Sequence, residues 1–235
     1  MAGSEYSQTG CQLSEGLRHY YLDTMGIQLW QALEQPVEET TADIQEDNDR
    51  IWQQLEQAVS SCTKCELHQS RTQTVLGVGN RNARLLIIGE APGKDEDLQG
   101  EPFVGRAGQL LNAMLAAIGL QREQIYIANV LKCRPPNNRD PLPEEAQACT
   151  PWLQQQIALI QPELIFVLGR IAAHHLLNTD RSLASLRGRT HQYAGIPLIV
   201  SYHPAYLLRQ PVEKRKSWQD LKYVKSLLNA HGGSS

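Results

Sequence analysis

The sequence predicts an α/β fold with three layers, α/β/α, around a central, mainly parallel four-stranded sheet, and an acidic N-terminal appendage. Two observations support this prediction. From about residue 83 onward, short apolar runs alternate with segments of helical apolar spacing, which is typical of a parallel sheet covered by helices. Residues 1–60 lack this alternation and contain 11 acidic against 2 basic residues. We therefore divide the chain into a leader, residues 1–54, and a main domain, residues 55–235.

Four apolar runs of strand length are followed by glycine or polar residues, as expected for strands buried on both faces of a sheet. They cover residues 83–89, 125–131, 163–169 and 196–201. Helical patterns cover residues 108–118, 143–160, 171–177 and 214–229. The second of these begins with Pro-Glu-Glu, which favours a helix start. Because sites in parallel sheets form at the carboxyl ends of the strands, the loops after the four strands should converge.

The leader contains two kinds of sequence. Residues 17–33 can form a short amphipathic helix, with Tyr21, Met25 and Leu29 among its apolar positions. Residues 34–49 are acidic and poor in apolar residues, which predicts a flexible linker. A segment that only screens a basic surface needs no apolar cluster, so we expect the leader to dock a partner protein.

Composition and charge limit the classes of function. No apolar run reaches the roughly 18 residues of a membrane span, and the N-terminus lacks the charged start and apolar stretch of a secretion signal. We therefore expect a cytoplasmic protein without a membrane partner. We also expect the protein to be a monomer. Residues 166–235 contain 10 basic against 3 acidic residues, although the whole chain has a net charge of −3. This asymmetry indicates a polyanion-binding face, with a solvated basic helix end as the alternative.

Four cysteines have a spacing that suggests a metal centre: Cys62, Cys65, Cys133 and Cys149. The first two form a C-x-x-C pair, 67 residues separate the second from the third, and 15 separate the third from the fourth. Without a secretion signal, a disulfide framework is not expected. A structural zinc usually uses two tight pairs, whereas thiolates from distant segments suit an iron–sulfur cluster better. Zinc and plain buried thiols are the alternatives.

Three loops at the predicted strand ends have distinctive sequences. They read GEAPGKDEDLQGEPFVGRAGQLL from Gly89, ANVLKCRPPNNRDP from Ala128 and SYHPAYLLR from Ser201. The first is not a phosphate-binding P-loop, because its lysine is followed by Asp95 where such a loop needs Ser or Thr. Together with the four cysteines, these motifs resemble the iron–sulfur uracil-DNA glycosylases, the family 4 branch of the uracil-DNA glycosylase superfamily.

This resemblance, which spans Leu55 to Leu228, implies a DNA repair enzyme. Such a glycosylase flips uracil out of DNA into a pocket and hydrolyses the N-glycosidic bond, which leaves an abasic site. The implied substrate is uracil-containing DNA. The implied cofactor is a [4Fe–4S] cluster held by Cys62, Cys65, Cys133 and Cys149.

The motifs contain the uracil-binding and catalytic residues that the resemblance implies. Phe103 can stack on the flipped base. The amide of Asn129 can donate to uracil O4 and accept from N3–H, a pattern that cytosine does not match. His203 can donate to uracil O2 as negative charge develops on the leaving base. The structural alternatives are a core phenylalanine, a strand-end turn asparagine and a histidine that only shapes its loop.

The group that activates water has two candidates in the first motif. Glu90 and Ala91 offer backbone donors at the pocket floor. Ala91 stands where better-known uracil-DNA glycosylases have an aspartate that positions water, so that base is missing. Glu96 or Glu90 can compensate, or the site relies on leaving-group stabilisation alone. Glu96 can instead fill space against the thymine methyl group.

The third motif and its surroundings are expected to contact DNA. Leu207 and Leu208 should form the wedge that enters the duplex, as apolar side chains do in other kinking proteins. Arg209 should hold a phosphate, and Arg187 and Arg189 should add backbone contacts.

Three other interpretations stay open. A related branch cross-links to DNA through a histidine between the two late cysteines, but residues 134–148 contain none. A non-catalytic iron–sulfur DNA-binding module would not need Phe103, Asn129 and His203 together, and a uracil-release assay distinguishes it. Residues 20–30 are similar to the N-terminus of the bacterial clamp-loader psi subunit, so the partner expected for the leader is a replication or repair protein.

Overall fold

The computed structural model describes residues 15–26 and 41–232. Two compact units divide the chain, Met1–Gln45 and Glu46–Ser235. In the first unit, helix α1 (Glu15–Thr24) covers the beginning of the predicted amphipathic helix, and a turn follows it. The rest of that helix prediction, including Leu29, and residues 34–40 of the predicted linker lie outside the described residues.

Helix α2 (Thr41–Ser60) corrects the linker prediction for residues 41–49, which are helical. Trp52, Leu55 and Val59 follow helical spacing and are at most 3% exposed. They belong to the second unit, and their apolar face stabilises this part of the helix by packing into the core of that unit. The Trp52 ring lies 5.6 Å from that of Tyr126. The division predicted after residue 54 falls inside this helix.

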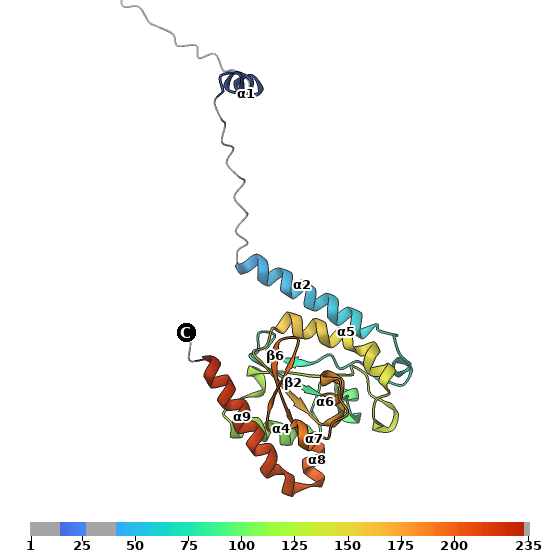
Figure 1. The fold of residues 1–235 in the computed structure, drawn as a ribbon. Helices are drawn as coiled ribbons and strands as arrows, with labels where there is room; N and C mark the ends of the chain where they lie inside the picture. Colours follow the sequence, from blue (N-terminus) through green and yellow to red (C-terminus); the bar gives the residue numbers. More distant parts are fainter. Residues whose placement is uncertain (1–14, 27–40, 233–235) are drawn as a thin grey trace, which may run out of the picture. The chain divides into compact units, whose positions relative to one another are not determined.

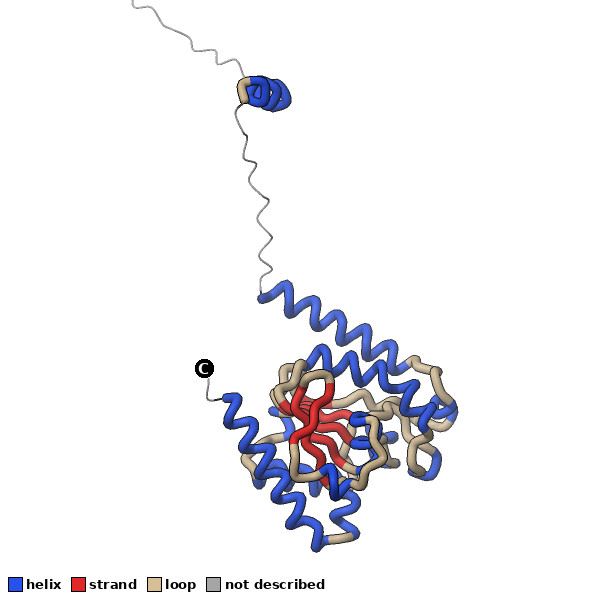
Figure 2. The backbone as a smooth tube through the Cα atoms, in the orientation of Figure 1, coloured by secondary structure: helices blue, strands red, loops and turns tan. Residues whose placement is uncertain are grey.

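Within the described residues, six strands form one mixed sheet in the order β1-β3-β2-β4-β6-β5. Figure 2 shows the strands, in red, with helices, in blue, around them. The pairs β2–β3, β2–β4 and β4–β6 are parallel, and the two edge pairs are antiparallel. The strands are β1 (Val78–Gly79), β2 (Leu85–Gly89), β3 (Tyr126–Asn129), β4 (Leu164–Leu168), β5 (Thr190–Tyr193) and β6 (Ile196–Ser201). The α/β class and the four predicted strands are confirmed, as β2, β3, β4 and β6.

The predicted total of four strands is wrong, because both edge strands lack the apolar runs used to find strands. β1 has only two residues, and β5 reads Thr-His-Gln-Tyr with alternating exposure. An edge strand pairs on one side only and can be short or polar, so its sequence need not resemble that of a buried strand.

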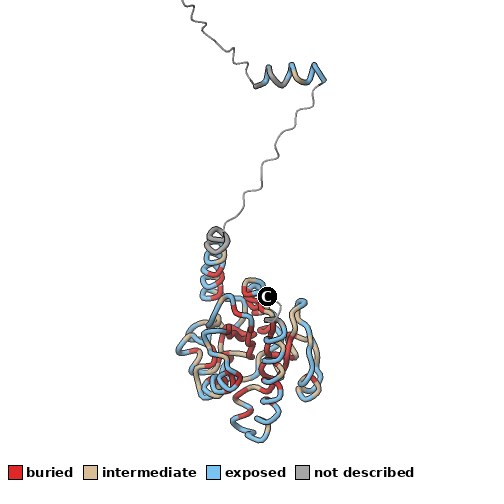
Figure 3. The backbone as a smooth tube through the Cα atoms, turned by 90° about the vertical axis from the view of Figure 1, so that its left-hand side faces the viewer, coloured by how far each residue is buried: buried red, intermediate tan, exposed pale blue. Residues whose placement is uncertain are grey.

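Helices cover both faces of the sheet (Figure 1). One face packs against α2, α5 (Pro143–Ile160), α6 (Arg170–Leu177) and α7 (Leu183–Leu186). The other packs against α4 (Arg106–Ala117), α8 (Pro204–Arg209) and α9 (Lys214–Gly232). Side chains of β2 alternate between the two cores, with Leu86 and Ile88 on the first and Leu85 and Ile87 on the second. Buried residues accordingly gather in the interior of this unit (Figure 3).

The four predicted helices of the main domain correspond to α4, α5, α6 and α9. Three short helices were not predicted, since four to six residues show little periodicity: α3 (Lys94–Gln99), α7 and α8. No helix among the described residues combines the length and apolar character that crossing a bilayer requires.

Candidate active site

A cavity of about 400 Å³ lies where the carboxyl ends of the parallel strands meet. Gly89 at the end of β2 is level with Asn129 at the end of β3, and Leu168 of β4 is level with Ser201 of β6. The loops that follow these strands therefore converge, as predicted. Their predicted pocket residues all line the one cavity: Glu90, Ala91, Glu96, Phe103, Asn129 and His203.

Asn129 presents an unpaired acceptor inside the protein. The residue is 2% exposed, and its Oδ1 atom is buried without a hydrogen-bond partner. A Cβ atom at Gly89 would collide with this oxygen and lie 2.7 Å from Cζ of Phe103. Any residue other than glycine would therefore displace the Asn129 amide or the Phe103 ring. Because buried polar atoms are normally paired, the free Oδ1 is suited to a donor on a bound ligand.

His203 precedes α8 and is held in one tautomer. Its Nδ1 atom accepts a 3.2 Å hydrogen bond from the backbone N–H of Ala205, so the proton of a neutral ring sits on Nε2. Burial, with a smaller contribution from the positive charge of Arg209, lowers the pKa of His203 to about 4. At neutral pH the ring is therefore an uncharged donor. It stacks on Phe103 with 5.4 Å between ring centroids and 29° between planes.

The Phe103 loop is fixed from several sides. Phe103 itself has a left-handed backbone, with φ of 54°, and is 6% exposed. The guanidinium of Arg122 donates to the carbonyl oxygens of Phe103 and Pro102. A Cβ atom at Gly108 would collide with the Phe103 carbonyl. Together these contacts keep Phe103 in its strained backbone conformation and so hold the aromatic ring against the cavity.

The two candidate glutamates have different surroundings. Both carboxylate oxygens of Glu96 accept backbone hydrogen bonds, from Gly93 at 3.1 Å, Val104 at 3.0 Å and Gly105 at 3.1 Å. Glu96 thus joins the start of α3 to the loop after Phe103. Among the described residues, none donates a backbone hydrogen bond to the Glu90 carboxylate. Burial, with a smaller effect of the Asp140 charge, raises the pKa of Glu90 to about 7.

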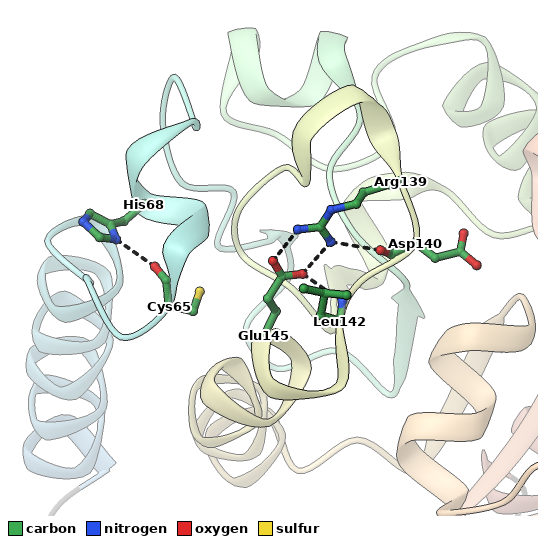
Figure 4. A network of polar contacts seen from close by, with 6 residues as sticks. All are labelled: Cys65, His68, Arg139, Asp140, Leu142 and Glu145. Carbon is green, nitrogen blue, oxygen red and sulfur yellow. Dashed lines mark hydrogen bonds and ion pairs between the residues drawn. The ribbon is translucent and has the colours of Figure 1, made fainter.

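One wall of the cavity comes from Arg139, which the sequence did not single out. Its guanidinium makes a two-pronged ion pair with Glu145, at 2.6 and 2.8 Å, and donates to the carbonyl of Asp140 (Figure 4). Glu145 is 2% exposed and also accepts from the N–H of Leu142 at the start of α5. The hydrogen bonds that Arg139 donates, together with its positive charge, lower the pKa of Glu145. The wall is therefore anchored to α5, a relationship that spacing alone does not indicate.

The four predicted cysteine ligands are free thiols, and contacts between their segments bring them near one another. Arg71 donates to Sγ of Cys133 at 3.1 Å and to the carbonyl of Ser60 at 3.0 Å. The backbone N–H of Lys132 lies 3.3 Å from Sγ of Cys149. Lys64, between Cys62 and Cys65, lies over the ring of Trp152, one turn after Cys149, with Nζ 4.1 Å from the ring centroid.

The four thiols do not converge on a site for a single metal ion. Among the residues described, no three His, Cys, Asp or Glu side chains lie close enough together to hold one metal ion. Burial raises the pKa of Cys149 to about 11 and also raises that of Cys133. Thiolates form here only if nearby positive charge offsets the burial, as a bound metal would.

Comparison with known proteins decides the family. The sequence profile of the Uracil DNA glycosylase superfamily matches residues 76–222. The chain belongs to the uracil-DNA glycosylase superfamily. It is 46% identical over 177 residues to a type-4 uracil-DNA glycosylase of Archaeoglobus fulgidus, covering 72% of this chain and 89% of the relative. A type-4 uracil-DNA glycosylase of Thermotoga maritima is 42% identical over 182 residues, covering 76% and 95%. A type-5 uracil-DNA glycosylase of Pyrobaculum aerophilum is 30% identical over 146 residues, covering 55% and 64%. The predicted type-4 assignment is confirmed.

In this glycosylase the predicted DNA-contacting residues separate into two groups. Leu208 is 37% exposed, and Arg189 and Arg209 are exposed. Leu207 is fully buried in the core between α4 and α9, so its predicted place in the wedge is wrong, because α8 turns its side chain inward.

The predicted DNA contact of Arg187 is also corrected. Its guanidinium pairs with Asp220 at 2.7 Å and lies over the Tyr202 ring at 4.3 Å. Only 10% of its side chain is exposed, and Asp220 also accepts from Ser201 at 2.6 Å. Arg187 therefore supports the loop that contains His203 instead of facing a phosphate.

Proposed function

We propose that this type-4 uracil-DNA glycosylase reads a flipped uracil with Asn129, Phe103 and His203 and then hydrolyses its N-glycosidic bond. The observation that supports this most directly is that Asn129 lines the cavity and that its buried Oδ1 has no hydrogen-bond partner. Uracil N3–H is a donor that would pair with it, while the amide N–H₂ group would donate to O4. Cytosine has an acceptor at N3, so it would leave Oδ1 unpaired, which is the basis of strong discrimination.

His203 is proposed to stabilise the leaving base. Its Nε2–H, set by the Ala205 contact, is a neutral donor at physiological pH. As the glycosidic bond breaks, negative charge spreads onto uracil O2, and a preorganised donor strengthens as that charge grows. Phe103, held against His203, would keep the base stacked and exclude water from its face.

Glu90 is proposed to position and activate the water, in preference to Glu96. The oxygens of Glu96 already accept three backbone hydrogen bonds and hold the loop. Glu90 lines the same cavity with a pKa near 7, which suits a base at neutral pH. Ala91 and the backbone beside it would then form the pocket floor without a second carboxylate.

The four cysteines are proposed to hold a [4Fe–4S] cluster. The contacts of Arg71, Lys132 and Lys64 bring the four cysteine segments near one another. Thiolates from such distant segments suit a four-iron cluster, in which each iron takes one thiolate, better than a zinc site built from two tight pairs. The N–H groups of Arg71 and Lys132 would donate to the sulfurs of Cys133 and Cys149. When bound, the cluster supplies cross-linking of distant segments, and no step of base release is assigned to it.

Uracil-containing DNA is proposed to lie across the mouth of this cavity. Leu208 would enter the duplex, and Arg189 and Arg209 would contact phosphates. We also propose that the protein acts as a monomer and that its leader docks a replication or repair protein. The described part of the leader supports this, because Tyr20 and Met25 on and after α1 are 67% and 63% exposed.

The decisive experiment is incubation of the purified chain with a uracil-containing oligonucleotide, followed by alkaline cleavage at abasic sites. Strand cleavage only at uracil supports the proposal. DNA binding without base release would instead favour a non-catalytic iron–sulfur DNA-binding module. Removal of residues 1–40, which leaves α2 intact, should preserve base release and DNA affinity while a pull-down loses the leader's partner. An unchanged set of captured proteins would contradict the docking role.

A further inference from the structure

One buried cation next to the pocket has no part in the chemistry described so far. The Lys132 side chain is 1% exposed, and its Nζ donates to the backbone carbonyl of Asn129 at 2.8 Å and to Oε1 of Gln156 at 2.5 Å. Gln156 is fully buried and is itself fixed, because its Nε2 donates to the carbonyl of Leu76 at 3.0 Å and to the hydroxyl of Tyr126 at 3.3 Å.

A fully buried lysine is unfavourable for stability alone. Removing an ammonium group from water costs several kcal/mol unless strong partners replace the solvent, and an apolar side chain of similar size is often as stable or more so. Both hydrogen-bond acceptors of Lys132 are neutral oxygens, one on the backbone and one on Gln156. The position of the ammonium group is therefore best explained by what it holds.

What it holds is the peptide group of the base-reading residue. Asn129 is the last residue of β3. A buried backbone carbonyl needs a hydrogen-bond partner, and Lys132 Nζ supplies one to Asn129. The main chain of the same lysine donates to Sγ of Cys149, and its own carbonyl accepts from Val75 at 2.8 Å. Lys132 thus joins the Asn129 pocket to the cysteine loop through one residue.

We propose that Lys132, with Gln156 behind it, is a positioning residue that fixes the Asn129 amide for uracil recognition and links it to the cysteine loop. This inference rests on the proposed role of Asn129. A displacement of about 1 Å at a reacting site can reduce rates roughly 100-fold, so small movements of this peptide matter. The lysine does not touch the base, and its effect passes through Asn129.

The test measures single-turnover uracil excision by Lys132→Met, Asn129→Ala and the double variant. Lys132→Met should be slower by about 10- to 100-fold, with unchanged affinity for uracil-containing DNA and weaker inhibition by free uracil. In the Asn129→Ala background the same substitution should have little further effect, because a residue that acts through Asn129 cannot act once the amide is gone. Additive losses would indicate a general packing defect and overturn the inference.

Gln156→Met keeps the test decisive if Lys132→Met loses iron or folds poorly. In the described part of the chain, Gln156 hydrogen-bonds to Lys132, Leu76 and Tyr126 and to no cysteine, so this variant should keep the wild-type iron-to-protein ratio and still excise uracil more slowly. Exposed Lys222→Met on α9 is the matched control and should be unaffected. A Gln156→Met protein with full iron content and wild-type excision overturns the inference. A wild-type rate for Asn129→Ala would instead overturn the proposed base-reading role.

Discussion

The backbone N–H of Ala205 donates to Nδ1 of His203 at 3.2 Å, two residues along the same turn. This contact leaves Nε2 as the donor of a neutral ring, and Phe103 stacks on the same ring. Because proline follows His203 and begins α8, the turn is rigid and the donor is aimed before a base arrives. The arrangement favours stabilisation of a leaving anion over proton donation.

His203→Ala should lower the single-turnover rate of uracil excision by about 10²- to 10³-fold, the scale expected when one oxyanion donor is lost. Affinity for uracil-containing DNA should change little, since phosphate contacts supply most of it. Rapid-quench kinetics and a binding titration measure the two quantities. Weaker binding with unchanged chemistry would mean that His203 only shapes its loop.

The excision rate should rise with pH through about 7, where Glu90 loses its proton. The sign follows from its role: a base is active when ionised, and the raised pKa moves that ionisation into the neutral range. Burial lowers the pKa of His203 to about 4, so this residue does not change its charge near pH 7. Glu90→Gln should be slow and nearly independent of pH between 6 and 8. A full pH dependence in this variant would assign the titration to another group.

Glu96→Ala should reduce stability, because three backbone N–H groups lose their acceptor. Loss of such bonds costs about 1–3 kcal/mol, measurable as a lower denaturant midpoint. The excision rate should fall only to the extent that the Phe103 loop becomes less rigid. If Glu96→Ala is as stable as the wild type but inactive, Glu96 is the base instead of Glu90.

Arg187 and Arg189 form a matched pair, two residues apart. Arg187→Ala leaves the buried Asp220 without its cation and should cost about 3–5 kcal/mol of folding stability. Arg189→Ala should leave stability unchanged but weaken DNA binding and reduce the salt slope of that binding by about 1. Unfolding curves and salt titrations separate the two outcomes. A stability loss in Arg189→Ala with weaker DNA binding alone in Arg187→Ala would contradict the roles given to the two residues.

Purified protein should be brown and contain about four iron atoms per chain, as a [4Fe–4S] cluster requires. Replacing Cys149, which lies on the buried face of α5, by serine should lower iron content and thermal stability together. Colourless protein with one bound zinc and full activity would contradict the cluster. Arg71→Gln, which removes the donor to Cys133, should retain iron but release it faster to a chelator.

The sequence by itself determined the fold class, the four central strands and the residues gathered at their ends. Buried parallel strands need continuous apolar runs, and chemistry at strand ends needs particular residue types, so both leave local patterns. The resemblance of the three strand-end motifs to the glycosylase family implied Phe103, Asn129 and His203 as site residues, and the structure places them on one cavity.

Tertiary structure alone decided which neighbouring side chains face the pocket, the core or the solvent. Leu207 and Leu208 are indistinguishable in sequence, yet one is fully buried and the other 37% exposed. Arg187 and Arg189 differ because Asp220, 33 residues after Arg187, accepts only the first. The Lys132–Asn129 contact and the edge strand β5 likewise depend on partners from distant segments. Orientation on a short helix and pairing across the chain are set by packing against those partners, and no local pattern encodes them.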